Sequence, residues 1–109
     1  MEELQMKSYV AHPKFPGVFM KHFFTSKDND FLNNLEVIIK PDCEIGLHTH
    51  EVYEFFYVVR GKGMSFGNNE WNPAEAGDAF SAKPGEMHGF KNTSKDDLVL
   101  FSTFAPAII

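Results

Sequence analysis

Short stretches rich in β-branched and aromatic residues recur along the chain, each bounded by polar, glycine or proline residues. Such stretches favour strands, because these side chains pack well on a pleated surface. Strands are expected at residues 18–25, 35–40, 45–50, 54–60, 63–66, 70–72, 78–82, 87–91 and 98–104. No stretch has a persuasive helical period, and the recurrence of strands and turns, about one per ten residues, is typical of an all-β sandwich or barrel.

The segments outside these strands contain turn signals and no internal repeat, low-complexity tract or linker. Residues 1–8 are expected to form a loose end or short edge segment, and residues 11–17, with two prolines, an irregular lead-in. Gly67, Asn68 and Asn69 tolerate the positive φ of a tight hairpin turn. Residues 1–109 are therefore expected to form a single domain around one core.

The predicted strand at 54–60 is apolar on both faces. Alternation places Phe56 and Val58 on one side and Phe55, Tyr57 and Val59 on the other. One face can line a barrel, while the other needs cover from a second sheet or from another chain. A small barrel has little chain to spare for this, so a homodimer is favoured over internal packing.

Composition and charge exclude several classes of partner. The formal net charge is −5 and the basic residues are scattered, which argues against nucleic acid because phosphate binding needs clustered Lys and Arg. No apolar stretch approaches the ~18 residues of a membrane helix, and residues 1–7 lack the apolar core of a signal peptide. The single cysteine, Cys43, fits a reducing compartment, so a cytoplasmic location is expected.

Candidate chemistry first appears at His48 and His50. Residues i and i+2 of a strand point to the same face, so both imidazoles would aim at one place. Glu54 begins the next extended run and can lie opposite them in a hairpin. Two imidazoles and a carboxylate that converge suit a divalent metal, although two nearby histidines in a strand are more often half-exposed polar residues.

A second constellation follows at residues 77–92, where a strand, a Pro-Gly turn and a return strand carry His88. Together the two stretches resemble the two sequence motifs of the cupin superfamily. In the first motif, His-x-His is followed by three residues, a glutamate, six residues and a glycine, which correspond to His48, His50, Glu54 and Gly61. In the second motif, Gly77, Gly85, His88 and Asn92 fall in register. The match spans residues 42–92, with Asp42 in place of the opening glycine and Pro84 one position late.

The resemblance implies an all-β cupin β-barrel of jelly-roll type. It also implies one divalent transition metal (Fe, Mn, Ni, Zn or Cu) held inside by His48, His50, Glu54 and His88. On an octahedral ion, four protein ligands leave two positions for a chelating substrate or for a substrate beside dioxygen, whereas tetrahedral zinc would be closed by the same four ligands. The sequence does not fix the identity of the metal.

Other residues near the motifs are weaker candidates. Phe56 shares a face with Glu54, and Phe90 shares one with His88, so both are candidates for an apolar substrate pocket, with ordinary core packing as the alternative. The remaining candidates are expected to pack or to face solvent: Tyr53, Tyr57, Trp71, Glu51, Glu86, His12, His22 and Cys43. Of these, Glu51 and Glu86 could also act as an acid or base or orient a ligand.

The function expected from the resemblance is binding of, or action on, a small oxygen-rich or carboxylate-bearing molecule at the metal. Cupins include dioxygenases, isomerases and decarboxylases, and also binding domains without turnover, so the fold alone does not decide whether this chain is an enzyme. A metal-dependent enzyme and a non-catalytic binding or sensor module therefore both stand as hypotheses.

Overall fold

A computed structural model describes residues 8–109, so most of the expected loose end at 1–8 lies outside the described residues. Within that range the regular elements are all strands: β1 (Val10–Ala11), β2 (Val18–His22), β3 (Asn33–Ile39), β4 (Glu44–His48), β5 (Tyr53–Arg60), β6 (Lys62–Gly67), β7 (Glu70–Glu75), β8 (Ala79–Ala82), β9 (His88–Lys91) and β10 (Leu98–Ala105). None of residues 8–109 belongs to a helix with the length and apolar character needed to cross a membrane.

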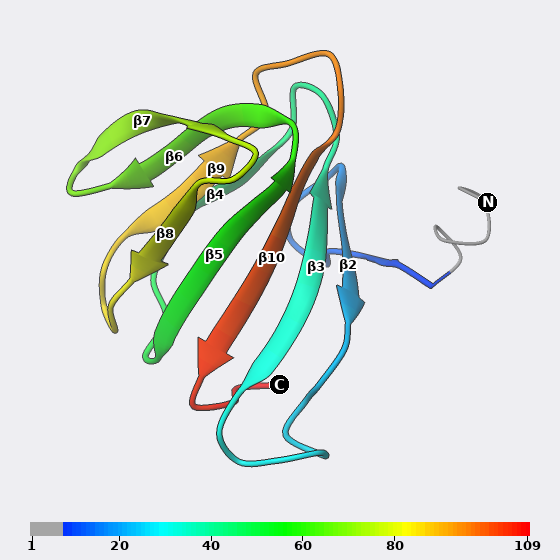
Figure 1. Ribbon diagram of the computed structural model, residues 1–109, viewed down its shortest axis with the longest axis vertical. Helices are drawn as coiled ribbons and strands as arrows, with labels where there is room; N and C mark the ends of the chain where they lie inside the picture. The colour runs from blue at the N-terminus through cyan, green and yellow to red at the C-terminus, as the bar shows by residue number, and fades with distance from the viewer. Residues whose placement is uncertain (1–7) are drawn as a thin grey trace.

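The strands form two antiparallel sheets that lie against each other (Figure 1). The larger sheet has the order β1-β2-β3-β10-β5-β8, and the smaller sheet has the order β4-β9-β6-β7. The last strand, β10, is inserted between β3 and β5 of the larger sheet, and β4 pairs with β9 in the smaller sheet. The fold is all-β, as the strand pattern predicts, and is the jelly roll that the resemblance implies.

The core lies between the two sheets and follows the alternation of each strand. On β10 the inward positions are Leu98, Leu100, Ser102 and Phe104, all buried. The other strands of both sheets contribute further buried apolar side chains, namely Val18, Leu35, Val37, Ile39, Phe56, Val58, Ala74, Ala82 and Phe90. Removing this apolar area from water stabilises the sandwich at ~25 cal/mol per Å², and a polar residue on an inward position therefore stands out.

All nine predicted strands are present, with shifted ends. β7 continues through Pro73, which is tolerated because β7 is the edge strand of its sheet. β4 ends at His48, so His50 lies beyond the strand. The pairing of β4 with β9 shifts register between Ile45 and His48, and the amide of Gly85, in the turn before β9, donates to the carbonyl of His50.

The turns explain the motif positions that carry glycine. Gly61 has φ of 90°, and a Cβ there would lie 2.4 Å from the carbonyl oxygen of Asp97. Asp42, which replaces the expected glycine, adopts φ of 62°, a conformation that aspartate tolerates better than most residues. Asn68 and Asn69 also have positive φ, as the hairpin prediction requires.

Asn92 is buried and donates to the carbonyls of Ile39 and Asp96, which fixes the connection between β9 and β10.

The outer face of β5 is uncovered within residues 8–109. Tyr53, Phe55, Tyr57 and Val59 are each close to half exposed, and the rings of Tyr53 and Phe55 stack with centroids 6.1 Å apart. The side chains of β5 alternate between its two faces as predicted. Within residues 8–109, internal packing therefore covers this face only in part.

Candidate metal centre

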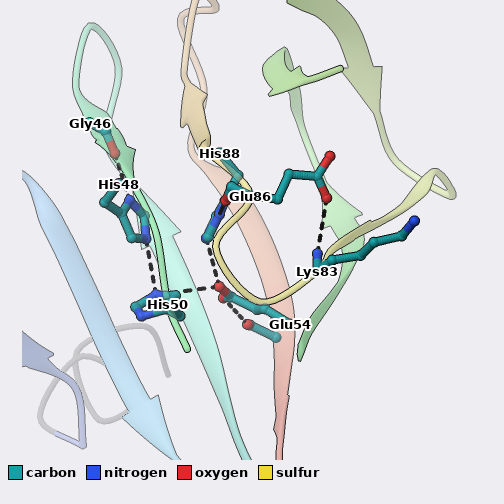
Figure 2. Close-up of polar contacts among 8 residues, drawn as sticks. Gly46, His48, His50, Glu54, Lys83, Glu86 and His88 are labelled. Carbon is teal, nitrogen blue, oxygen red and sulfur yellow. Dashed lines mark hydrogen bonds and ion pairs between the residues drawn. The ribbon is translucent and has the colours of Figure 1, made fainter. Parts of the chain in front are cut away.

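Both sheets contribute to one cluster of four side chains between them. His48 ends β4 and His88 begins β9, and the two residues face each other in the ladder of the smaller sheet. Glu54 lies on β5 of the larger sheet, and His50 lies in the connection between β4 and β5. Figure 2 shows the three imidazoles and the carboxylate pointing toward one another. The structure therefore brings together the four residues that the resemblance to the cupin motifs singled out.

The donor atoms of the cluster are close together. His88 Nε2 lies 2.9 Å from Glu54 Oε1, and His50 Nε2 lies 3.6 Å from the same oxygen. His48 Nε2 is 3.1 Å from His50 Nε2. One ligand atom from each residue lies within 4.8 Å of all the others. Ligand atoms bound to one ion at ~2.0–2.2 Å lie within about 4.4 Å of one another, so binding would need contraction by only a few tenths of an ångström.

Backbone carbonyls fix the tautomers of two imidazoles. His48 Nδ1 lies 2.7 Å from the carbonyl oxygen of Gly46, and His88 Nδ1 lies 2.9 Å from that of Glu86. A carbonyl oxygen only accepts, so Nδ1 donates in both rings, and in the neutral form each Nε2 presents its lone pair to the cluster. Metal-binding histidines are oriented in this way by a hydrogen bond from the other ring nitrogen.

Ser102 completes the environment of the carboxylate and was not among the predicted site residues. Its hydroxyl on β10 donates to Glu54 Oε2 at 2.5 Å. The other carboxylate oxygen of Glu54, Oε1, faces His88 and His50 (Figure 2). Both Ser102 and Glu54 are buried. The sequence did contain a signal for it, because Ser102 is the polar member of the inward row on an otherwise apolar strand face.

Burial and neighbouring charges act differently on the three histidines. Burial lowers the pKa of His48 and of His50, and hydrogen bonding to Gly46 or the charge of Glu54 offsets this only in part. Burial also acts to lower the pKa of His88, but its hydrogen bonds to Glu54 and Glu86, together with their charges, raise the pKa overall. Two of the three rings are thus kept in the neutral, metal-binding form.

The donor set suits a divalent transition metal. Imidazole nitrogen and carboxylate oxygen suit Fe, Mn, Ni, Cu and Zn. A buried carboxylate surrounded by three imidazoles whose nitrogens converge is a set of groups that a cation would satisfy together. The cluster could hold one metal ion, with solvent or a ligand at the remaining positions.

The cluster borders a cavity of about 310 Å³ between the two sheets. Phe56 and Phe90, the candidates for a substrate pocket, line it with their ring centroids 4.9 Å apart. Most other lining side chains are also apolar, including Met20, Leu35, Val37, Ile45 and Phe104. An apolar cavity with a few convergent polar groups is the usual form of a small-molecule site.

Three residues of the lead-in also line this cavity, although the sequence pattern gave no reason to place them there. They are His12, Lys14 and Phe15. The ring of His12 packs on Phe15 with centroids 4.7 Å apart, and Phe15 lies 6.0 Å from His48 by the same measure. His12 was expected at the surface or in packing. It does pack on Phe15, and it also lines the cavity beside the cluster.

The side chains of the remaining candidates add no donor atom to the cluster, although the backbone carbonyl of Glu86 orients His88. Tyr53 and Tyr57 are on the outer face of β5, and Glu51 is exposed. The carboxylate of Glu86 accepts from the amide of Lys83 at 2.9 Å and lines a separate cavity behind His88. Trp71 packs on Phe66 and under the ammonium of Lys91, and Cys43 fills the space that Gly17 leaves. These positions agree with the packing and solvent roles expected for them.

A small jelly roll with three imidazoles and one carboxylate gathered between its sheets defines a class of barrel with an internal candidate metal site. The family model of the cupin domain matches residues 35–104, a range that contains all four cluster residues. The chain belongs to the cupin domain family.

Individual relatives agree with this assignment. The chain is 36% identical over 61 residues to an oxalate-binding protein of Thermotoga maritima, a match that covers 55% of this chain and 50% of the relative. The chain thus spans about half the length of that curated relative. A crystal structure described as a predicted oxalate decarboxylase of T. maritima superposes with a TM-score of 0.79 at 25% identity over 90% of both chains. KdgF from Halomonas sp. gives a TM-score of 0.79 at 26% identity, covering 92% of this chain and 86% of that chain.

Proposed function

We propose that the chain binds a small carboxylate-bearing molecule of the oxalate type at a divalent transition metal held by His48, His50, Glu54 and His88. The observation that carries the proposal is the convergence of these four side chains at one border of an apolar cavity. Phe56 and Phe90 form part of the wall that surrounds the ligand. The similarity to an oxalate-binding protein supports a carboxylate as the ligand.

Hydrogen bonds to neighbouring groups determine which atom each site residue would offer to the metal. His48 and His88 present Nε2 because Gly46 and Glu86 hold their Nδ1 protons. Glu54 offers Oε1 to the centre, since Ser102 occupies its other oxygen. The metal, when bound, supplies positive charge and open positions at which carboxylate oxygens can bind. The apolar wall excludes water and so strengthens that electrostatic attraction.

Binding without turnover is the reading that the cavity favours. Among the described residues that line the cavity, Glu54 has the one acidic side chain, and it is already engaged by Ser102 and His88. Glu51 and Glu86, the candidate acids, are not among those lining residues. The alternative, turnover of the same ligand such as decarboxylation, is favoured by the similarity to the predicted oxalate decarboxylase. Release of carbon dioxide from oxalate by the metal-loaded protein would distinguish the two.

Metal analysis tests the proposal first. Purified protein, or protein incubated with Fe, Mn, Ni or Zn, is expected to hold about one divalent ion per chain, and His88→Ala should hold much less. Metal should be released as the pH falls through about 6.5 and below, because imidazole binds metal only when neutral. Calorimetry with oxalate should then show binding by the loaded protein and none after chelation. Protein without metal under every loading condition would refute the proposal.

We further propose that the chain forms a homodimer through the outer face of β5. A second copy related by a two-fold axis presents the same exposed row of Tyr53, Phe55, Tyr57 and Val59, so each copy covers the apolar row of the other. We also propose that the protein is cytoplasmic and that residues 1–109 form a single domain. Sedimentation of the protein over a range of concentrations measures the association.

A further inference from the structure

The cavity beside the four-residue cluster has one fully charged cation among its described lining residues. That residue is Lys14, which is exposed, so it lies where the cavity meets solvent. Most of the rest of the lining is apolar, apart from the histidines, Thr49, Glu54 and Ser102. A cation at the rim of an apolar cavity favours ligands that carry negative charge there.

The backbone that carries Lys14 is held in place by hydrogen bonds. We call residues 12–17 the strap. The amide of His12 donates to the carbonyl of Val18 at 2.8 Å, which closes the strap at its base. His12 Nδ1 accepts from the amides of Lys14 and Phe15, at 3.0 and 3.3 Å. Pro13 and Pro16 restrict φ within the strap. Lys14 therefore extends from a constrained backbone.

The strap lies against the strand that carries His48. Phe15 packs closely over Gly46, where an added Cβ would make a tight contact of 3.2 Å with the ring of Phe15. The ammonium of Lys14 lies 5.7 Å from the centroid of that ring. Lys14 is also close enough to act electrostatically on His12 and His48. The cation is thus beside the cluster but separate from it.

No acidic side chain among residues 8–109 neutralises this ammonium. The lysine ion pair found there joins Lys40 to Asp97 at 3.2 Å, and the two other pairs involve histidines of the cluster. Lys14 is therefore available to an anionic group of a ligand. A charge-assisted hydrogen bond of this kind is stronger than a neutral one.

We infer that Lys14 determines specificity by binding a second anionic group of a ligand whose first carboxylate faces the four-residue cluster. The inference rests on the proposed function and narrows its ligand class to small dianions, such as dicarboxylates with a spacer between their charged ends. One end binds at the cluster, the spacer lies along the apolar wall, and the other end meets Lys14 at the rim.

Calorimetry on metal-loaded protein tests this role with three probes. Malonate and succinate carry two carboxylates, and acetate carries one. Lys14→Met is expected to weaken the binding of the better dicarboxylate by about tenfold or more, and the binding of acetate by less than about twofold. Lys14→Arg should restore most of the affinity because it keeps the charge. Lys62→Met, at an exposed position of β6, changes net charge equally and should leave all three affinities unchanged.

Metal content is measured on every variant before titration, so that the two proposals can fail separately. Equal losses for acetate and dicarboxylates in Lys14→Met, or no loss for either, would overturn the role of Lys14 while leaving the metal site intact. A wild-type protein that holds metal but prefers acetate would do the same. A wild-type protein that retains neither metal nor carboxylate would overturn both proposals.

Discussion

The two faces of β5 are similar in apolar character but have different surroundings. On the inner face Phe56 is 6% exposed and Val58 is 0% exposed, and both pack with the core next to the cluster. On the outer face Phe55 and Tyr57 are 48% and 49% exposed. Alternation assigns residues to faces but says nothing about what covers each face. The inner face lines a cavity and carries a residue of the candidate metal centre, whereas the outer face is about half exposed.

Removal of an inner ring should have the largest effect. Phe56→Ala is expected to lower the free energy of unfolding by about 3–5 kcal/mol, because it leaves a void beside Phe90 and His88. Phe55→Ala, one residue away on the other face, should cost less than about 1 kcal/mol when the chain is monomeric. Urea unfolding in the presence of a chelator compares the two without a metal contribution. Similar losses would contradict the different surroundings of the two faces.

A charge placed on the outer face should break self-association while leaving the fold intact. In a two-fold dimer, Tyr57→Lys introduces two like charges into one interface, which costs several kcal/mol of association free energy. The free energy of unfolding per chain should change little, because Tyr57 is exposed. Sedimentation should show monomers for Tyr57→Lys and dimers for Asn69→Lys, whose charge lies in the exposed β6–β7 turn. Dimers of Tyr57→Lys would show that the interface lies elsewhere.

The hydroxyl behind Glu54 should matter for metal affinity. Ser102→Ala removes the hydrogen bond to Glu54 Oε2 and is expected to weaken metal binding about 10–100-fold, the usual cost of losing a group that orients a ligand. Thr103→Ala removes the next hydroxyl along β10, on the outward side, and should leave metal affinity unchanged. Competition with a chelating dye measures both constants. Equal affinities for the two variants would remove Ser102 from the site.

Local geometry explains why the four cluster residues could be predicted. His48, His50 and Glu54 are close in sequence, so short-range spacing relates them, whereas His88 was joined to them through the resemblance of its strand and Pro-Gly turn to the second cupin motif. Strand alternation alone places Phe56 on the same face as Glu54, and Phe90 on the same face as His88. His50 reaches the cluster even though it lies beyond β4, because the Gly85 amide holds its carbonyl.

Long-range pairing explains what the sequence did not reveal. Ser102 meets Glu54 only because β10 is inserted beside β5, a pairing across a sequence separation of 48 residues. The strap has no hydrophobic period, and its Phe15 packs closely over Gly46. Such contacts arise from the assembled sheets, so neither propensity nor spacing predicts them.

The smallest expected effect concerns the carboxylate on the opposite face of the larger sheet. Glu36 on β3 accepts from the hydroxyl of Tyr9, just as Glu54 inside accepts from Ser102. Burial, with the hydrogen bond and charge of Glu36, raises the pKa of Tyr9 to about 12. The folded chain favours the neutral phenol, so this pair contributes stability below about pH 10 that is lost as the pH rises toward 12.

Ultraviolet titration of tyrosinate can resolve this phenol. The difference between wild type and Tyr9→Phe should titrate near pH 12, and Glu36→Gln should move that transition back toward 10 because the carboxylate charge is gone. Metal content should be unaffected by Glu36→Gln and greatly reduced by Glu54→Gln, since only the inner carboxylate faces the three imidazoles. A difference curve centred near 10 in wild type would show that the outer pair does not hold the proton of Tyr9.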